Sequence, residues 1–424
     1  MVSRRQQRLA WCLFDFANSA FNTVVVTFVY ATYFATTLVG GKERGDAAWA
    51  DMMSVSGLAI AVLAPFAGAH ADRSAHKRRW LVGTSLVVVA CSAALVLPAP
   101  DPALGRGSAS SVWSALLLVG LANVAFELMF VFYNAFLPQL ATPTDMGRLS
   151  GRGWAFGYVG GLACLALCLG FVGFGSVGPW VTREGALNVR VTALVVAFWF
   201  LVFGLPMFLL VRDERASPRE TLPPSAAPRS VLATVRSLPQ RPDLLRFLLA
   251  HLVYNDALMG LINLAGLYMA ITLGMSTGEI MVTAIGLNVL AGIGALGFGG
   301  LDDRLGPRPV ILLSLVLLVG GSVLAIAVPT KQAFWVAASL VGVGMGPNQS
   351  ASRTLLARLA EGGRSAEYFG LFALSGKATV WLAPFLFARV VEATESQRLG
   401  LLPLLLMFAI GFVLMLGVRH DGKR

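Results

Sequence analysis

Twelve apolar runs follow one another along this chain of 424 residues, and each can cross a hydrocarbon core about 30 Å thick as a helix of about 20 residues. Only 13% of the residues are charged and the mean hydropathy is +0.72, whereas soluble domains carry about 25% charged residues. The runs are 9–39, 52–69, 80–97, 112–137, 153–174, 191–211, 247–273, 280–301, 310–328, 333–351, 368–388 and 399–418. The sequence therefore predicts an all-α integral membrane protein with twelve transmembrane helices in two six-helix halves.

A repeated loop divides the chain into these halves. The pattern Gly-x-x-x-Asp-Arg-x-(Gly/Ala)-x-(Lys/Arg) occurs twice, 231 positions apart, each time after the second apolar run of its half. The two copies carry Gly68, Asp72, Arg73, Lys77 and Arg78, and Gly299, Asp303, Arg304, Gly306 and Arg308. Duplicated membrane halves with a working site between them are typical of secondary transporters. We expect an N-terminal half at 1–211 and a C-terminal half at 247–424.

The segment 212–246 reads as a cytoplasmic linker between the halves. It is rich in Pro, Ser and Arg and too polar to span a membrane. Residues 230–238 within it have the pattern of a surface amphipathic segment.

The net charge of +11 is explained by the orientation of the chain in the membrane. In a soluble protein such an excess would suggest a nucleic-acid partner. Here 24 of the 33 Lys and Arg residues fall on one side of the alternating topology and 8 on the other. Because basic residues concentrate on the cytoplasmic side of membrane proteins, both termini are predicted to be cytoplasmic and no nucleic-acid partner is expected.

Polar residues inside the apolar runs are functional candidates, because burying them in a membrane is costly. The candidates for a solute or coupling-ion site are Asp15, Asn18 and Asn22 on one face of the first run, Asn123 and Glu127 in the fourth, Asn255, Asp256 and Asn263 in the seventh, and Lys377 in the eleventh. Structural roles remain open for them. Asp15 could anchor its helix near the interface, Asn123 could bond a neighbouring helix, and Glu127, Asp256 and Lys377 could form structural ion pairs.

Other patterns indicate packing. The G-x-G-x-x-G at 292–297 lies inside an apolar run without the preceding strand that a dinucleotide site needs. We interpret it, and the glycines at 153–161, as close contacts between helices. There is no Walker A or H-E-x-x-H sequence. We predict that the protein is not an enzyme, with no catalytic residues, cofactor or metal site.

The repeated loop resembles the signature between the second and third helices of the major facilitator superfamily. Three stretches are similar to its vacuole-effluxer-like branch, which includes autophagy-linked vacuolar amino-acid effluxers of fungi. They are the first-helix segment 11–21, the segment 133–161, and the segment 349–377. The resemblance implies a twelve-helix exporter of amino acids or similar small solutes, with helices one, four, seven and eleven lining a central cavity.

We therefore expect a secondary transporter that works by alternating access, monomeric, surrounded by lipid in a bacterial plasma membrane. Proton coupling is a hypothesis: an acid such as Glu127 can be neutral in one state and charged in another, because burial disfavours the charged form. A drug or metabolite antiporter is the alternative within transport. A membrane sensor or lipid-handling scaffold that moves nothing is the alternative outside it.

Overall fold

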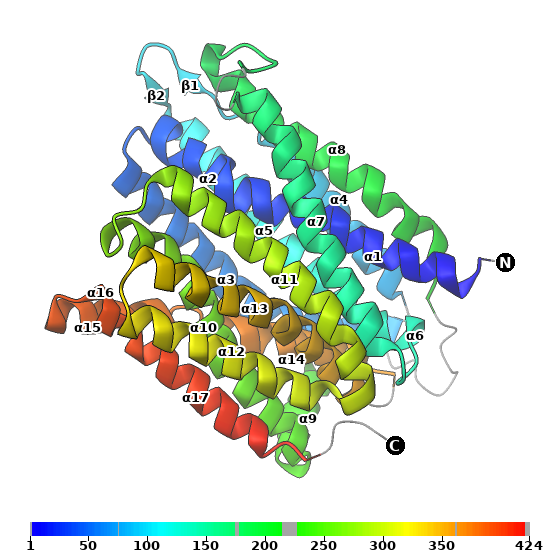
Figure 1. The fold of residues 1–424 in the computed structure, drawn as a ribbon. Coiled ribbons are helices and arrows are strands. Elements are labelled where there is room, and N and C mark those ends of the chain that lie inside the picture. The colour runs from blue at the N-terminus through cyan, green and yellow to red at the C-terminus, as the bar shows by residue number, and fades with distance from the viewer. Residues whose placement is uncertain (1, 75, 174–177, 214–226, 361–362, 420–424) are drawn as a thin grey trace. The chain divides into compact units, whose positions relative to one another are not determined.

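Helices make up most of the chain in the computed structural model, which describes residues 2–74, 76–173, 178–213, 227–360 and 363–419 (Figure 1). Ten helical segments of this described part are long and apolar enough to cross a membrane. The two further long helices are α4 (Lys77–Ala94) and α13 (Lys331–Leu359). Basic residues begin α4 and a polar stretch interrupts α13, which lowers their hydropathy.

The described chain divides into two compact units, and the first contains Met1–Ile60, His76–Tyr133 and Phe156–Glu214. Its elements are α1 (Arg4–Ala20), two π-helical segments (Phe21–Phe28 and Phe34–Leu38) around α2 (Tyr30–Tyr33), most of α3 (Lys42–Ser74), α4, β1 (Pro100–Asp101), β2 (Arg106–Gly107), α5 (Ala109–Asn134), most of α7 (Met146–Val172), a 3-10 turn (Glu184–Ala186) and α8 (Leu187–Leu210). The strands form a small antiparallel hairpin that pairs Pro100 with Gly107 and Asp101 with Arg106.

The first membrane span departs from the regular helix that the sequence predicts. Regular α-helix ends at Ala20, and the π-helical segment that follows has a wider turn. The expectation that Asp15, Asn18 and Asn22 share one face assumed an uninterrupted period of 3.6 residues. In the structure Asp15 and Asn18 are buried, whereas Asn22 is exposed at the start of the π-helical segment.

The second unit contains Ala61–Ala75, Asn134–Ala155 and Arg215–Arg424. Its further elements are α6 (Leu137–Leu140), α9 (Ala227–Ser237), a 3-10 turn (Leu238–Gln240), α10 (Pro242–Ile271), α11 (Thr277–Leu305), α12 (Pro307–Ala327), α13, α14 (Ser365–Lys377), α15 (Leu382–Thr394), α16 (Gln397–Gly400) and α17 (Leu402–Leu416). Helix α13 packs on α11 and α12, and α17 packs on α10 and α12 (Figure 1).

Glycines allow the closest of these helix contacts. A Cβ atom on Gly294 of α11 would lie 2.3 Å from the carbonyl oxygen of Val343 on α13. In the first unit, a Cβ on Gly160 of α7 would lie 2.1 Å from the carbonyl oxygen of Phe16 on α1. Both glycine-rich patterns therefore lie where helices pack backbone to backbone, as the packing interpretation requires.

The compact units do not coincide with the two sequence halves. Residues 61–75 and 134–155 belong to the N-terminal half of the sequence, yet they pack with the helices of the C-terminal half. The division of the sequence into halves with a linker at 212–246 remains a prediction, and residues 214–226 of that segment lie outside the described residues. The amphipathic segment expected at 230–238 falls within and just beyond α9.

The eleventh apolar run is not one continuous helix. Helix α14 ends at Lys377, residues 378–381 form turns, and α15 begins at Leu382. Pro384 lies in the first turn of α15, and in a continuous helix its ring would clash with the carbonyl four residues earlier, inside the turn, so the local sequence favours the break. Contacts from α10 hold the end of α14 and the turn that follows it.

Candidate functional site

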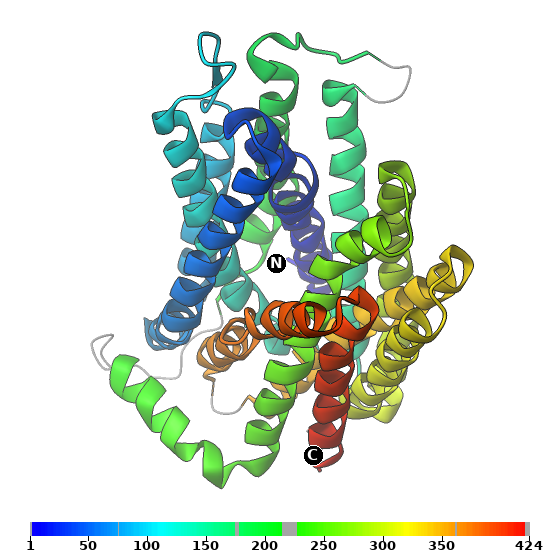
Figure 2. The ribbon, with the colours of Figure 1, turned by 90° about the vertical axis from the view of Figure 1, so that its left-hand side faces the viewer.

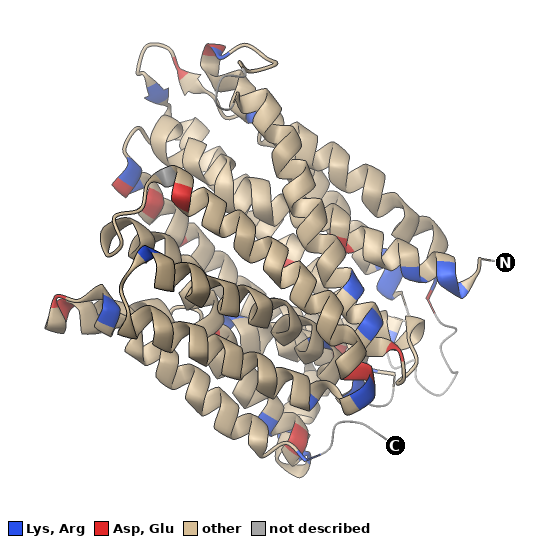
Figure 3. Ribbon diagram, viewed as in Figure 1, with Lys and Arg blue, Asp and Glu red and all other residues tan. Residues whose placement is uncertain are grey.

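Charged residues gather near the ends of the helices, and Figure 3 shows long uncharged stretches between them. Among the described residues, no cluster of three or more His, Cys, Asp or Glu side chains is suited to hold a metal ion. Three groups of charged and polar side chains stand out among the described residues: one around Asp15, one around the break after Lys377, and one around the repeated loops.

Asp15 lies in an aromatic enclosure in the first unit. Its carboxylate accepts a hydrogen bond of 2.7 Å from the Tyr133 hydroxyl. Trp11 stacks on the Tyr133 ring with 4.6 Å between centroids, and its indole N–H donates to the Tyr133 carbonyl. Phe14 packs on the same ring. These contacts join α1 to α5. The Tyr133 hydroxyl is thus a structural partner of the Asp15 carboxylate, as the anchoring role left open for Asp15 requires.

The other candidates of the first unit have separate surroundings. Asn18 is buried and donates to the Phe14 carbonyl one turn earlier. Asn123 donates a 2.8 Å hydrogen bond to Ser56 of α3, so it does bond a neighbouring helix. Glu127 is half-buried one turn further along α5. The structure therefore does not bring the amides of Asn18 and Asn123 into one cluster.

In the second unit, three residues of α10 hold the break between α14 and α15, and we call His251, Leu252 and Asn255 the α10 clamp. The Asn255 amide donates to the Gly376 carbonyl at 3.2 Å, where the end of α14 leaves carbonyls without helical partners. His251 Nδ1 lies 2.8 Å from the Ser375 hydroxyl.

The third member of the clamp reaches the turn after α14. The Thr379 hydroxyl donates a 3.5 Å hydrogen bond to the Leu252 carbonyl of α10. Asp256, one turn further along α10, is 1% exposed, and its two carboxylate oxygens have no hydrogen-bond partner among the described residues. Asp256 is therefore a buried acid beside the break, available to a bound cation or ammonium group.

Lys377 is the last residue of α14 and is half-buried. The clamp therefore fixes the backbone within one residue of the candidate lysine through the Gly376 carbonyl. Asn263, two turns beyond Asp256 on α10, is exposed, and the structure does not bring it to the break.

The two repeated loops make equivalent contacts within the second unit. Asp72 Oδ2 accepts a 2.7 Å hydrogen bond from the backbone N–H of Glu367 in the first turn of α14. Asp303 Oδ1 accepts a 2.7 Å hydrogen bond from the N–H of Gly147 in the first turn of α7, and its Oδ2 is paired with Arg148 at 2.7 Å. Each aspartate therefore caps a helix that belongs to the other half of the sequence.

The remaining loop residues support the same arrangement. A Cβ on Gly68 would lie 2.1 Å from the Ala366 carbonyl oxygen, and one on Gly299 would lie 3.0 Å from the Gly147 carbonyl oxygen. Gly306 has a φ of +94° at the end of α11, a conformation that suits glycine. Arg308 donates to the Met415 and Leu416 carbonyls and so caps α17. In the first loop, the backbone N–H of Arg78 donates to Asp213 within the first unit.

We call the contact of residues 61–75 and 134–155 with α11, α13 and α14 the inter-half seam. Its centre is Arg353 of α13, which is 2% exposed. Its guanidinium donates to the Ser150 hydroxyl and carbonyl at 2.9 and 2.6 Å, and to Asn134 Oδ1 at 3.3 Å, and it lies 5.5 Å from the Trp154 ring centroid.

Sequence reasoning missed Arg353 and Glu367 as site residues. Arg353 was counted among the basic residues of the cytoplasmic side, and Glu367, an acid, did not enter that count. Glu367 is 1% exposed and accepts hydrogen bonds from Ser230 and Thr234 of α9. The available signal was their position inside the stretches that carry the family resemblance, where a surface charge would have no reason to be fixed.

Comparisons with known proteins agree with this architecture. The family described as "Vacuole effluxer Atg22 like" matches residues 37–424. The chain is 24% identical over 420 residues to the MFS-type transporter YxiO of Bacillus subtilis, covering 98% of this chain and 95% of YxiO. It is 23% identical to autophagy-related protein 22 of Yarrowia lipolytica, covering 65% of this chain and 51% of that protein, so it spans about half of the fungal relative.

A solved structure gives the fold. The transporter FucP, in its outward conformation, matches with a TM-score of 0.73 at 14% identity, with 98% of each chain covered. FucP is a transporter of the major facilitator superfamily, so the predicted twelve-helix fold is confirmed. The match to the vacuole effluxer family and to YxiO confirms the prediction of an integral membrane transporter that is not an enzyme. The chain belongs to the vacuole effluxer Atg22-like family and has the fold of the major facilitator superfamily.

Proposed function

We propose that this transporter exports amino acids or related small solutes by alternating access, with the inter-half seam as its cytoplasmic gate. The observation that carries the proposal is the reciprocal capping by the repeated loops, in which Asp72 caps α14 and Asp303 caps α7. Each cap joins the two halves of the sequence. Rocking of the halves about a central site requires such contacts to form in one state and break in the other.

The proposed solute site uses the polar residues of the spans. The Lys377 ammonium is suited to a solute carboxylate, and an acid such as Asp256 or Glu127 is suited to a solute ammonium. One constellation would then recognise both ends of an amino acid. Asn18, Asn22, Asn123, Asn255 and Asn263 complete the candidate set with Asp15. Proton coupling through Glu127 belongs to this proposal as a second step.

Solute flux in proteoliposomes tests the proposal. Purified protein loaded with one labelled amino acid at a time should exchange at least one member of a broad panel in a protein-dependent way. Imposing a pH gradient of either sign then tests proton coupling. No flux across the panel, together with unchanged metabolite levels in deletion and overexpression strains, would favour the sensor or scaffold alternative.

We predict that Asp72→Asn and Asp303→Asn each slow flux about twofold to tenfold while membrane abundance stays within about twofold. The expected size follows from the loss of one charged helix cap, which contributes about 0.3–2 kcal/mol. Initial efflux rates in proteoliposomes measure the effect. Asp243→Asn is the matched control, because Asp243 also accepts a backbone N–H, that of Arg419, but within the C-terminal half. Full activity in both loop variants would show that the loops do not take part in the cycle.

The proposed orientation places both termini in the cytoplasm of a bacterium with the protein in its plasma membrane. Cysteine at Ala103, exposed in the β1–β2 turn, should then react with an impermeant reagent in intact cells. Cysteine at Thr144, exposed between α6 and α7, should react only after permeabilisation. The four native cysteines are buried and provide a low background. Reversed labelling at both positions would overturn the orientation.

A further inference from the structure

Helix α9 has an inner face that is fixed to the inter-half seam. Ala227 and Val231 pack against Ala69 of α3. The hydroxyls of Ser230 and Thr234 donate to the two carboxylate oxygens of Glu367, at 2.9 and 2.5 Å. The backbone N–H of the same Glu367 donates to Asp72. The inner face of α9 is thus two hydrogen bonds away from the loop aspartate that caps α14.

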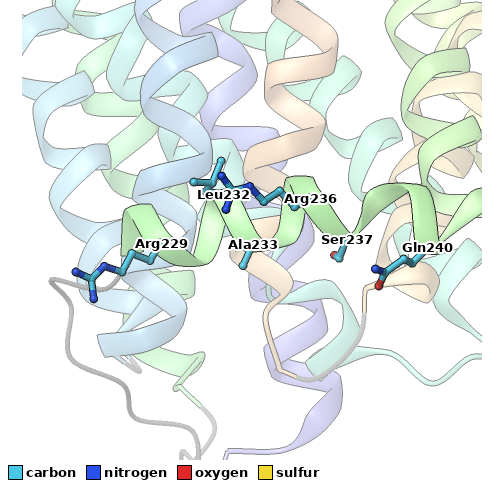
Figure 4. Close-up of a pocket in the computed structure, with 6 residues that line it drawn as sticks. All are labelled: Arg229, Leu232, Ala233, Arg236, Ser237 and Gln240. Carbon is cyan, nitrogen blue, oxygen red and sulfur yellow. The ribbon is translucent and has the colours of Figure 1, made fainter.

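The outer face of α9 has a different composition. Arg229, Leu232, Ala233 and Arg236 line an open hollow that continues onto Ser237 and Gln240 (Figure 4). Leu232 is 49% exposed, and Val235 beside it is 42% exposed. The two arginines are seven residues apart, which places them on one side of the helix about 10 Å from each other. Cationic and apolar groups are therefore exposed together on one short helix.

The position of α9 in the chain indicates what its outer face contacts. The helix ends at Ser237, and the 3-10 turn Leu238–Gln240 leads directly into the membrane span Pro242–Ile271. Figure 2 shows α9 (bright green) running at a steep angle to the helix that follows it. We take a helix joined this closely to a span and inclined to it to lie at the level of the lipid headgroups. Exposed arginines at that level favour anionic lipid, and the apolar side chains beside them reach the acyl boundary.

We propose that the outer face of α9 binds anionic phospholipid, with Arg229 and Arg236 contacting headgroup phosphates and Leu232 and Val235 entering the acyl boundary. Charge complementarity selects this occupant, since both charged side chains that line the hollow are cationic. Because the inner face of α9 holds Glu367, bound lipid steadies the contact between α9 and α14. The lipid site does not depend on the identity of the transported solute.

Hydrogen exchange of the full-length protein in nanodiscs tests the site. Nanodiscs of phosphatidylcholine are compared with nanodiscs in which about 30% of the lipid is phosphatidylglycerol. We expect the α9 amides to exchange on the order of tenfold more slowly with phosphatidylglycerol, because each arginine near an anionic surface adds to the attraction. Arg229→Gln/Arg236→Gln should abolish this difference, and Leu232→Ser should reduce it.

The control removes the same net charge elsewhere. Arg106→Gln/Arg183→Gln changes two exposed arginines outside α9 and should keep the full lipid effect. Equal protection of α9 in both lipids would mean that something other than anionic lipid covers the face, such as a second copy of the chain, and would overturn the proposal. A lipid effect that survives in Arg229→Gln/Arg236→Gln would overturn it as well. Neither result requires transport to be measured, so the proposed lipid site can be rejected while the proposed export of solutes stands.

Discussion

Replacing Gly68 with alanine is expected to reduce solute flux about tenfold or more by preventing the inter-half seam from closing. The new Cβ would lie 2.1 Å from the carbonyl oxygen of Ala366 and 2.6 Å from its carbonyl carbon, so backbone must move. Separation of α3 from α14 would also lengthen the hydrogen bond from the Glu367 N–H to Asp72. Overpacking of a close contact costs about 1–3 kcal/mol, which shifts the closed-to-open ratio about 5- to 150-fold.

The opening of the inter-half seam can be measured directly. Ser365 is buried and donates to the Ala135 carbonyl across the seam, so a cysteine there reports opening by its rate of labelling in permeabilised cells. Gly68→Ala should raise that rate. Gly300→Ala is the matched control, because a Cβ on Gly300, in the second repeated loop, meets no atom within 4 Å. Unchanged flux and labelling in Gly68→Ala would contradict the gate assignment.

Replacing Lys377 with glutamine is expected to reduce flux at least about 30-fold while leaving a folded protein. The reason is the proposed contact with the solute carboxylate, since removing one partner of a buried charge pair costs about 2–5 kcal/mol. Flux in proteoliposomes and thermal unfolding in detergent measure the two effects. Lys331→Gln is the control: Lys331 pairs with Glu279 at 2.8 Å, but both side chains are about 40% exposed, so little change is expected.

Double variants separate binding from a structural ion pair. If Lys377 binds solute, adding Asp256→Asn or Glu127→Gln to Lys377→Gln should not restore flux. If Lys377 instead forms a permanent pair with one of these acids, Lys377→Gln should lose stability, because it leaves a buried charge without its partner. The matching double variant would then recover both stability and flux. Such a recovery is the result that would rule out solute binding by Lys377.

The architecture was predictable because it depends on composition and repetition. The twelve runs follow from the length of apolar segments that a bilayer requires, and the two loops follow from a repeat that is visible in the letters alone. The break after Lys377 has a mark in the sequence, Pro384, which the prediction of one continuous span overlooked; the contact from Asn255, 121 residues before Gly376, is tertiary and could not be predicted. The π-helical segment after Ala20 was missed because apolar runs carry no mark of a wider turn.

The candidate site was predicted in part. Asp15 was recognised as a buried acid, but its partner Tyr133 lies 118 residues away, and no spacing rule connects them. Arg353 was counted as a cytoplasmic charge, because in the sequence alone a buried arginine beside a span resembles a cytoplasmic one, and Glu367 was not singled out. Their burial depends on the return of 134–155 and of α9 onto the C-terminal helices, which is tertiary information.

Helix α14 is short, and its two ends lie at different functional parts of the structure. Its first turn meets Asp72 at the inter-half seam, and its last residue is Lys377. With 13 residues, it is a rod roughly 20 Å long. The first turn of this rod is held by Asp72, and its last turn is held by Asn255 and His251. One rigid helix therefore spans the distance between the inter-half seam and the candidate lysine, so the position of Lys377 is set by contacts at both ends.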